Sequence, residues 1–110
     1  MAATSTVTPG APVNPLRERA PEIGRAFAPF FQALMKEGAL SVKQKELIAL
    51  GIAVAVRCEE CIDAHLEKCL KAGATSQEVM GSTGVAVLMG GGPAYMTASY
   101  VAERLQLAGA

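Results

Sequence analysis

The strongest structural signal in this chain lies in residues 41–73, which read SVKQKELIALGIAVAVRCEECIDAHLEKCLKAG. Ser41 and Gln44 have the spacing of a capping box, in which each side chain satisfies a backbone amide of the first helical turn. Ten residues without a polar side chain follow at 47–56. Ile and Val in this run also fit a buried strand, but the capping box and the alanine content favour a helix. We therefore expect a helix from Ser41 that is apolar on every face and is buried by its own subunit together with a neighbour.

A second helix is expected over residues 58–72. Two glutamates lie in its first turn and two lysines in its last, so that the charges complement the helix dipole at both ends. Gly73 is placed to cap its C-terminus. Because only a short turn separates this helix from the one before it, the two should pack as antiparallel neighbours.

The C-terminal part adds further helices and no strand. Thr75 and Glu78 form a second capping box, which opens a helix to about Met89. Three glycines then turn the chain, and Pro93 begins a final helix to about Leu107. No period-two alternation or internal repeat is present, so the predicted fold class is all-α, with five to six helices and short loops.

The N-terminal part divides into two sections. Residues 1–14 are mostly Ala, Thr, Pro and Gly without periodicity, and they are expected to form a flexible tail. Apolar residues at helical spacing then predict one broken helix or two short ones, with a restart at Pro21, a kink at Pro29 and an end near Gly38. The predicted organisation is thus a tail at 1–14 and one all-helical domain at 15–110.

Composition excludes several classes of function. The 110 residues are 51% hydrophobic and 18% charged, which excludes a disordered chain. Ten basic and ten acidic residues give zero formal charge, so that nucleic acid is not an expected partner. A mean hydropathy of +0.30 in so short a chain favours burial between subunits, and we expect a homo-oligomer.

The cysteine count, the N-terminal residues and the uncharged segment near the C-terminus indicate the compartment. Three cysteines fit a disulfide framework poorly, and residues 1–10 lack the features of a signal peptide, so we expect a cytoplasmic protein. Residues 79–102 carry no charge, but the Gly-Gly-Gly-Pro segment at 90–93 breaks them into halves too short to cross a bilayer. We therefore expect no membrane association.

The cysteine helix carries the candidate chemistry. Cys58, Cys61, His65 and Cys69 fall on one stripe of a helix, and His65 is the only histidine in the chain. Zinc is unfavourable, because the first and last of these residues lie roughly 16 Å apart along the axis whereas a sulfur ligand sits about 2.3 Å from the metal. We predict no metal and no cofactor. Cys69 is interpreted as a small apolar filler.

Dithiol redox chemistry fits this stripe better. Two cysteines three residues apart at a helix start can close a disulfide, and both the helix N-terminus and a nearby imidazolium favour a thiolate. Cys61, one turn from His65, is the candidate nucleophile and Cys58 its partner. Glu59 and Glu60 oppose ionisation, and a pair of inert buried cysteines is the alternative interpretation.

Glu46 strengthens the redox interpretation. If the first helix turns back near residue 57, Glu46 lies about 15 Å from the turn and His65 about 10 Å from it on the antiparallel partner, so the two should come level. The carboxylate could then orient the imidazole, which takes the thiol proton directly or through water. The alternative is a solvated acid that pairs with Lys43.

These residues resemble a known family. The runs KELIALGIAV at 45–54 and KAGAT at 71–75, with Cys58-x-x-Cys61-x-x-x-His65 between them, are similar to the alkylhydroperoxidase D-like, carboxymuconolactone decarboxylase superfamily. The resemblance is specific between about residues 40 and 75 and looser from there to the C-terminus. Glu46 precedes Cys58 by twelve positions, which is the spacing of the family.

The resemblance implies an all-helical fold that assembles as trimers or hexamers and reduces peroxides or disulfides. It implies that Cys61 attacks the peroxide and becomes a sulfenic acid, and that Cys58 donates a proton and then resolves it as a disulfide. Glu46 and His65 would form the proton relay, and an unidentified dithiol would recycle the protein. Glu60 stands where peroxidase members can carry a histidine, which leaves a general thiol–disulfide role open.

Two other functions stay open on the sequence. The first is a decarboxylase or isomerase-like activity on a small lactone acid, with His65 as acid or base. Lactone decarboxylases of the superfamily lack the cysteine pair, which favours the redox branch. The second is a non-catalytic module whose helices only build an oligomer.

Overall fold

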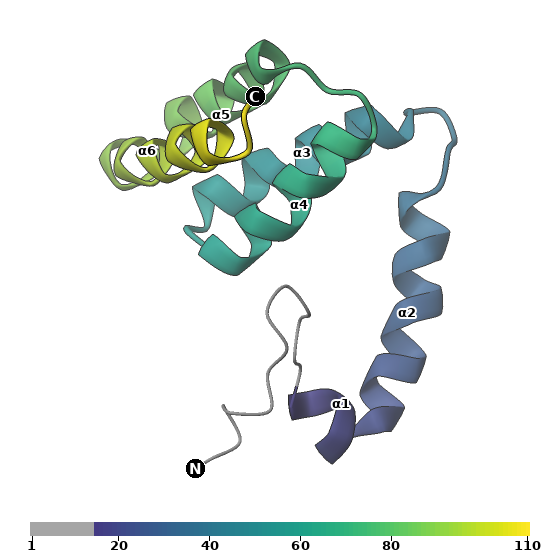
Figure 1. Cartoon of the computed structure of the whole chain (residues 1–110). Coiled ribbons are helices and arrows are strands. Elements are labelled where there is room, and N and C mark those ends of the chain that lie inside the picture. The colour runs from purple at the N-terminus through teal and green to yellow at the C-terminus, as the bar shows by residue number, and fades with distance from the viewer. Residues whose placement is uncertain (1–14) are drawn as a thin grey trace. The chain divides into compact units, whose positions relative to one another are not determined.

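The computed structural model describes residues 15–110, and these residues form helices and no strand. The elements, shown in Figure 1, are α1 (Pro15–Arg19), α2 (Pro21–Met35), α3 (Val42–Ala55), α4 (Glu59–Lys71), α5 (Ser76–Gly90) and α6 (Gly92–Leu107). The predicted all-α class with five to six helices is confirmed. The tail predicted at 1–14 lies outside the described residues.

The chain divides into two compact units, one that ends at Leu34 and one that spans Met35–Ala110. The first contains α1 and nearly all of α2, neither of which buries a residue. Pro21 begins α2 as predicted, and Pro29, the predicted position of a kink, lies inside this helix. The ring of Phe27 contacts those of Phe30 and Phe31, with centroids 6.2 and 5.8 Å apart.

The end of α2 at Met35, before the predicted position near Gly38, has a local cause. The carbonyl of Lys36 accepts a hydrogen bond from Lys45 Nζ at 2.8 Å, and Glu37 Oε1 accepts one from the backbone amide of Val42 at 3.0 Å. Residues 36 and 37 therefore bond to the start of α3 and do not extend α2.

Helices α3 to α6 form the core of the second unit. Helix α3 packs against both α4 and α5, and α5 packs against α6. The path of the chain in Figure 1 shows α3 and α4 running antiparallel, as the short turn predicts. The buried apolar side chains are Leu50, Ala53, Val54, Ile62, Leu66, Cys69, Ala74, Val79, Ala86, Ala94, Val101 and Leu105.

Side-chain caps fix the starts of α3 and α5. Ser41 Oγ accepts the Gln44 amide at 3.0 Å, and Gln44 Oε1 accepts the Ser41 amide at 2.8 Å. Thr75 and Glu78 exchange the same two bonds, at 3.0 and 2.9 Å. Both capping boxes are confirmed, which is why the predicted helix starts agree closely with the structure.

The apolar run of α3 is only partly buried within the chain. Glu46, Leu50, Ala53 and Val54 are buried, whereas Ile48 and Ile52 on the other side are exposed, Ile52 by 58%. Three helices of 13 to 16 residues, α4, α5 and α6, cover one side of α3 but do not surround it. Burial of the remaining face by a neighbour stays a prediction.

Close contact between α3 and α5 depends on one glycine. A Cβ at Gly51 would lie 3.0 Å from Ser82 Oγ, and this hydroxyl donates a hydrogen bond to the carbonyl of Leu47.

Across residues 15–110, none of the helices combines the length and the apolar character that a membrane span needs.

Candidate functional site

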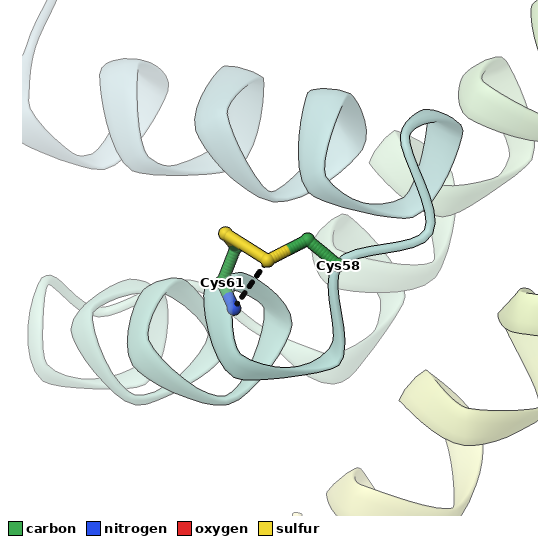
Figure 2. The surroundings of a disulfide bond; sticks show 2 residues. All are labelled: Cys58 and Cys61. Carbon is green, nitrogen blue, oxygen red and sulfur yellow. Dashed lines mark hydrogen bonds between the residues drawn. A yellow bond between two sulfur atoms is a disulfide. The ribbon is translucent and has the colours of Figure 1, made fainter.

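The cysteine pair lies at the turn from α3 to α4. Cys58 is the N-cap of α4, and its Sγ accepts the backbone amide of Cys61 at 3.2 Å. The two cysteines form a disulfide with Cα atoms 5.2 Å apart, within the usual range for such bonds. Figure 2 shows the bonded pair at the start of α4, with the Cys61 amide directed at the Cys58 sulfur. The local helical geometry thus places two sulfur atoms within bonding reach.

Glu46 and His65 meet across the α3–α4 contact. Glu46 Oε1 and His65 Nδ1 are 2.7 Å apart, although the residues are 19 positions apart in sequence. Glu46 is only 4% exposed, and the imidazole is mostly buried. The prediction that the two side chains lie at the same height along the paired helices is therefore correct. Lys43 pairs instead with Glu78 at 3.1 Å, which excludes the alternative of a Lys43–Glu46 pair.

The histidine shares one face of α4 with the cysteines. Cys61 and His65 are four residues apart, which places them on adjacent turns of that face. Cys61 is exposed and Cys58 partly so, which does not fit the alternative of a buried, inert pair. The arrangement gives a small molecule access to sulfur beside a carboxylate–imidazole pair.

Cys69 belongs to the core. It is fully buried, and burial raises the pKa of its thiol to about 11, with the nearby negative charge of Glu46 adding to the rise. This thiol stays protonated at neutral pH and is a poor nucleophile. Its interpretation as an apolar filler agrees with this environment.

Sequence reasoning missed a polar cluster that joins α4 to α6. The carboxylate of Asp63 accepts hydrogen bonds from Nε and Nη2 of Arg104, at 2.9 and 3.1 Å, and from the Tyr100 hydroxyl at 2.9 Å. The Arg104 hydrogen bond is the main cause that lowers the pKa of Asp63. The Arg104 guanidinium also lies 5.1 Å from the centroid of the Tyr100 ring. Since these partners are about 40 residues apart, no local pattern in the sequence could have revealed them.

Two open grooves border the helices. One of about 610 Å³ lies beside the Asp63–Arg104 pair, and one of about 590 Å³ lies between α3 and α5 and includes Ile48, Ile52 and Val85. No group of three or more His, Cys, Asp or Glu side chains in residues 15–110 is arranged to hold a metal ion.

A model of the carboxymuconolactone decarboxylase family matches residues 21–104, which include the cysteine pair, Glu46 and His65. The chain belongs to this family. A protein of Paracoccus denitrificans, uncharacterized protein 4 in the cox locus, is 34% identical over 77 residues, or 70% of this chain and 69% of that protein. An uncharacterized protein of Cupriavidus necator is 33% identical over 84 residues, or 76% of this chain and 74% of that protein.

Solved structures of carboxymuconolactone decarboxylase family proteins have the same helical fold. The apo crystal structure of a family member from Legionella pneumophila superimposes with a TM-score of 0.78 and 42% identity, covering 83% of this chain and 81% of that one. A family member from Thermotoga maritima gives a TM-score of 0.65 and 27% identity, covering 76% of this chain and 91% of that one. The family resemblance predicted from the sequence is confirmed.

Proposed function

We propose that this family member is a thiol-dependent oxidoreductase that reduces hydroperoxides or disulfides with Cys58 and Cys61. The observation that carries the proposal is the 2.7 Å contact between Glu46 and His65, on the helix face that bears an accessible cysteine pair. A lone C-x-x-C is a weak signal, but a buried carboxylate bonded to the neighbouring imidazole supplies the proton acceptor that a thiol nucleophile needs.

The carboxylate sets the role of each ring nitrogen. An ionised Glu46 only accepts hydrogen bonds, so His65 Nδ1 carries a hydrogen toward it and Nε2 is the nitrogen that takes a proton. Glu46 also stabilises the imidazolium that forms. His65 is thereby a general base for the thiol of Cys61, one helical turn away, directly or through water.

The proposed cycle balances two electrons and two protons. The Cys61 thiolate attacks the outer oxygen of ROOH, the O–O bond breaks, and the alkoxide takes a proton from Cys58 to leave as ROH. The Cys58 thiolate then attacks the sulfur of the Cys61 sulfenic acid, which forms the disulfide and breaks the S–O bond. The leaving hydroxide takes the proton held on His65 and departs as water. An external dithiol reduces the disulfide by two thiol–disulfide exchanges and is itself oxidised.

Two observations support the redox role over a lactone decarboxylase. The cysteine pair forms a disulfide, which has no part in a decarboxylation. An antioxidative role has been suggested for the Thermotoga maritima family member. The proposal includes assembly of this chain into a trimer or hexamer, as the family resemblance implies, and the exposed large apolar side chains of α3 and α5 support burial between subunits.

The test is to mix the reduced protein with a hydroperoxide or a small disulfide and follow the loss of thiols by rapid alkylation and mass spectrometry. We expect one Cys58–Cys61 disulfide per equivalent of oxidant. Glu46→Gln should slow the reaction roughly tenfold to a hundredfold, because the imidazole loses its orientation and its charge partner.

Glu67→Gln is the matched control, because Glu67 is an exposed acid on α4 that pairs with Lys71. It should react at the rate of the wild type. The proposal is wrong if neither kind of oxidant forms the disulfide, or if Glu46→Gln reacts as fast as Glu67→Gln. Full turnover of a lactone acid by a protein with both cysteines changed to serine would instead favour the decarboxylase.

A further inference from the structure

Three of the helices in residues 15–110 end in the same backbone motif, but one of them departs from the others in sequence. At the end of α4, the amides of Gly73 and Ala74 bond back to the carbonyls of Leu70 and Cys69, and Gly73 has φ +92°. The end of α6 repeats this pattern around Gly109, with φ +75°. This is the Schellman motif, in which the residue with positive φ is usually glycine.

At the end of α3 the same position is occupied by Arg57. The amides of Arg57 and Cys58 bond to the carbonyls of Val54 and Ala53 at 3.1 and 3.0 Å, and Arg57 has φ +59°. It is the one non-glycine residue with positive φ in the described part of the chain. A side chain at this conformation is unfavourable compared with glycine, so the backbone does not explain the arginine.

The surroundings give the guanidinium a different use. Arg57 is exposed, directly precedes Cys58, and makes no ion pair or side-chain hydrogen bond within residues 15–110. It is the only Lys or Arg between Lys45 and Lys68, a segment that also holds five acidic residues. Two of these acids, Glu59 and Glu60, are exposed between the two cysteines in the first turn of α4, and without Arg57 their negative charge would repel an anion.

We propose that Arg57 makes the cysteine pair selective for oxidants that carry a carboxylate next to the reacting S–S or O–O bond. This inference rests on the proposed redox function. The exposed guanidinium binds the carboxylate through charge-assisted hydrogen bonds and holds the reacting bond beside the cysteines. It thereby offsets the repulsion from Glu59 and Glu60, which occupy the first turn of α4.

A disulfide oxidant gives the simplest reaction to measure. A protein thiolate attacks one sulfur of RSSR, which breaks the S–S bond and releases RS⁻ while a mixed disulfide forms. The second cysteine then attacks the protein sulfur of the mixed disulfide and releases a second RS⁻. The protein dithiol loses two electrons and two protons, and the oxidant becomes two molecules of RSH.

The experiment compares three aliphatic disulfides that differ in charge: dithiodipropionate, a dianion; bis(2-hydroxyethyl) disulfide, which is neutral; and cystamine, a dication. Second-order rate constants are measured with the reduced full-length protein at low ionic strength. For the wild type we expect the dianion to react fastest, relative to its rate with free cysteine. tert-Butyl hydroperoxide, which is neutral, and a hydroperoxy carboxylate form a second arm that tests O–O oxidants in the same way.

Three variants of Arg57 separate charge from backbone. Arg57→Gln should slow the dianion by about threefold to fivefold while changing the neutral disulfide less than twofold, as expected for loss of one nearby exposed charge. Arg57→Lys should retain most of the preference. Arg57→Gly should lose the preference as Gln does, yet unfold at a higher temperature because the strained backbone is relieved.

Lys71→Gln is the matched control, since it removes one exposed cation at the opposite end of α4. It should keep the preference of the wild type, and added salt should abolish the preference in both proteins. An Arg57→Gln protein with the same charge preference as Lys71→Gln would overturn the inference while leaving the redox function intact. Failure of all the oxidants to react would instead refute the redox function.

Discussion

The proposed chemistry of this protein rests on single residues at and beside the α3–α4 turn. The Cys61 amide donates to Cys58 Sγ, so that the positive end of the α4 dipole acts on the Cys58 sulfur. The imidazole, by contrast, lies one turn beyond Cys61 and takes its proton in the proposed cycle. The helix dipole thus favours the thiolate of Cys58, and the imidazole favours that of Cys61. Their roles can therefore be tested separately.

Single serine variants test these roles. Cys58→Ser should still react with a hydroperoxide and should accumulate a sulfenic acid on Cys61, because no accessible thiol is left to resolve it. Cys61→Ser should react roughly ten to a hundred times more slowly, because its remaining accessible thiol lacks the adjacent base. Trapping of the sulfenic acid with dimedone, followed by mass spectrometry, measures both. A sulfenic acid that forms faster on Cys58 in the Cys61→Ser protein would reverse the assignment.

The residue scale also shows where prediction from the sequence succeeds. The contact between Glu46 and His65 was predictable, because two antiparallel helices with a short turn fix which positions come level. The positive φ of Arg57 was not, since the sequence has no glycine there to mark the end of α3.

At the scale of elements, helix starts were easier to predict than helix contacts. Capping boxes are local, so the sequence located the starts of α3 and α5. The end of α2 depends on bonds from Lys36 and Glu37 to α3, and it was placed too late. The α4–α6 contact depends on Asp63 and Arg104, which no pattern within either helix connects.

Asp63→Asn should weaken the contact between α4 and α6. Because the Asp63 and Arg104 side chains are each 40% exposed, solvent screening limits the expected loss to about 1 kcal/mol of unfolding free energy. The Arg104 hydrogen bond lowers the pKa of Asp63 from its usual 3.8, so the carboxylate stabilises the native state above that pH and loses this effect as the pH falls. The stability difference between wild type and variant should therefore shrink below pH 3.8 in thermal unfolding.

Glu103→Gln provides the comparison for this variant, because Glu103 is an exposed acid next to Arg104 on the same helix. It should leave stability nearly unchanged at every pH. A difference between wild type and Asp63→Asn that stayed constant down to pH 2 would show that the titration of Asp63 does not control this contact.

At the scale of the whole molecule, the apolar content exceeds what one chain buries. Composition predicted this excess, and the structure leaves large apolar side chains exposed on α3 and α5, among them Ile48, Ile52, Val85 and Met89. The sequence could not show which face of α3 stays uncovered, because its apolar run has no polar side to mark solvent.

Ile52→Lys should interfere with the proposed assembly. We expect the wild type to sediment as a trimer or hexamer of the 11.4 kDa chain, and the variant to sediment as a smaller species with unchanged helix content. Leu107→Lys, a similarly exposed apolar position at the end of α6, is the control and should keep the native mass. Sedimentation of the wild type as a monomer would exclude the assembly.

The short span of the Cys58–Cys61 disulfide has a consequence for turnover. The bond joins residues three positions apart at the start of one helix, so it closes a small ring and removes little entropy from the unfolded chain. The core, by contrast, is built by the packing of four helices with one another. In the proposed redox cycle, repeated oxidation and reduction of this bond therefore change the stability of the native fold little, and the reductant meets the same helical core in every round.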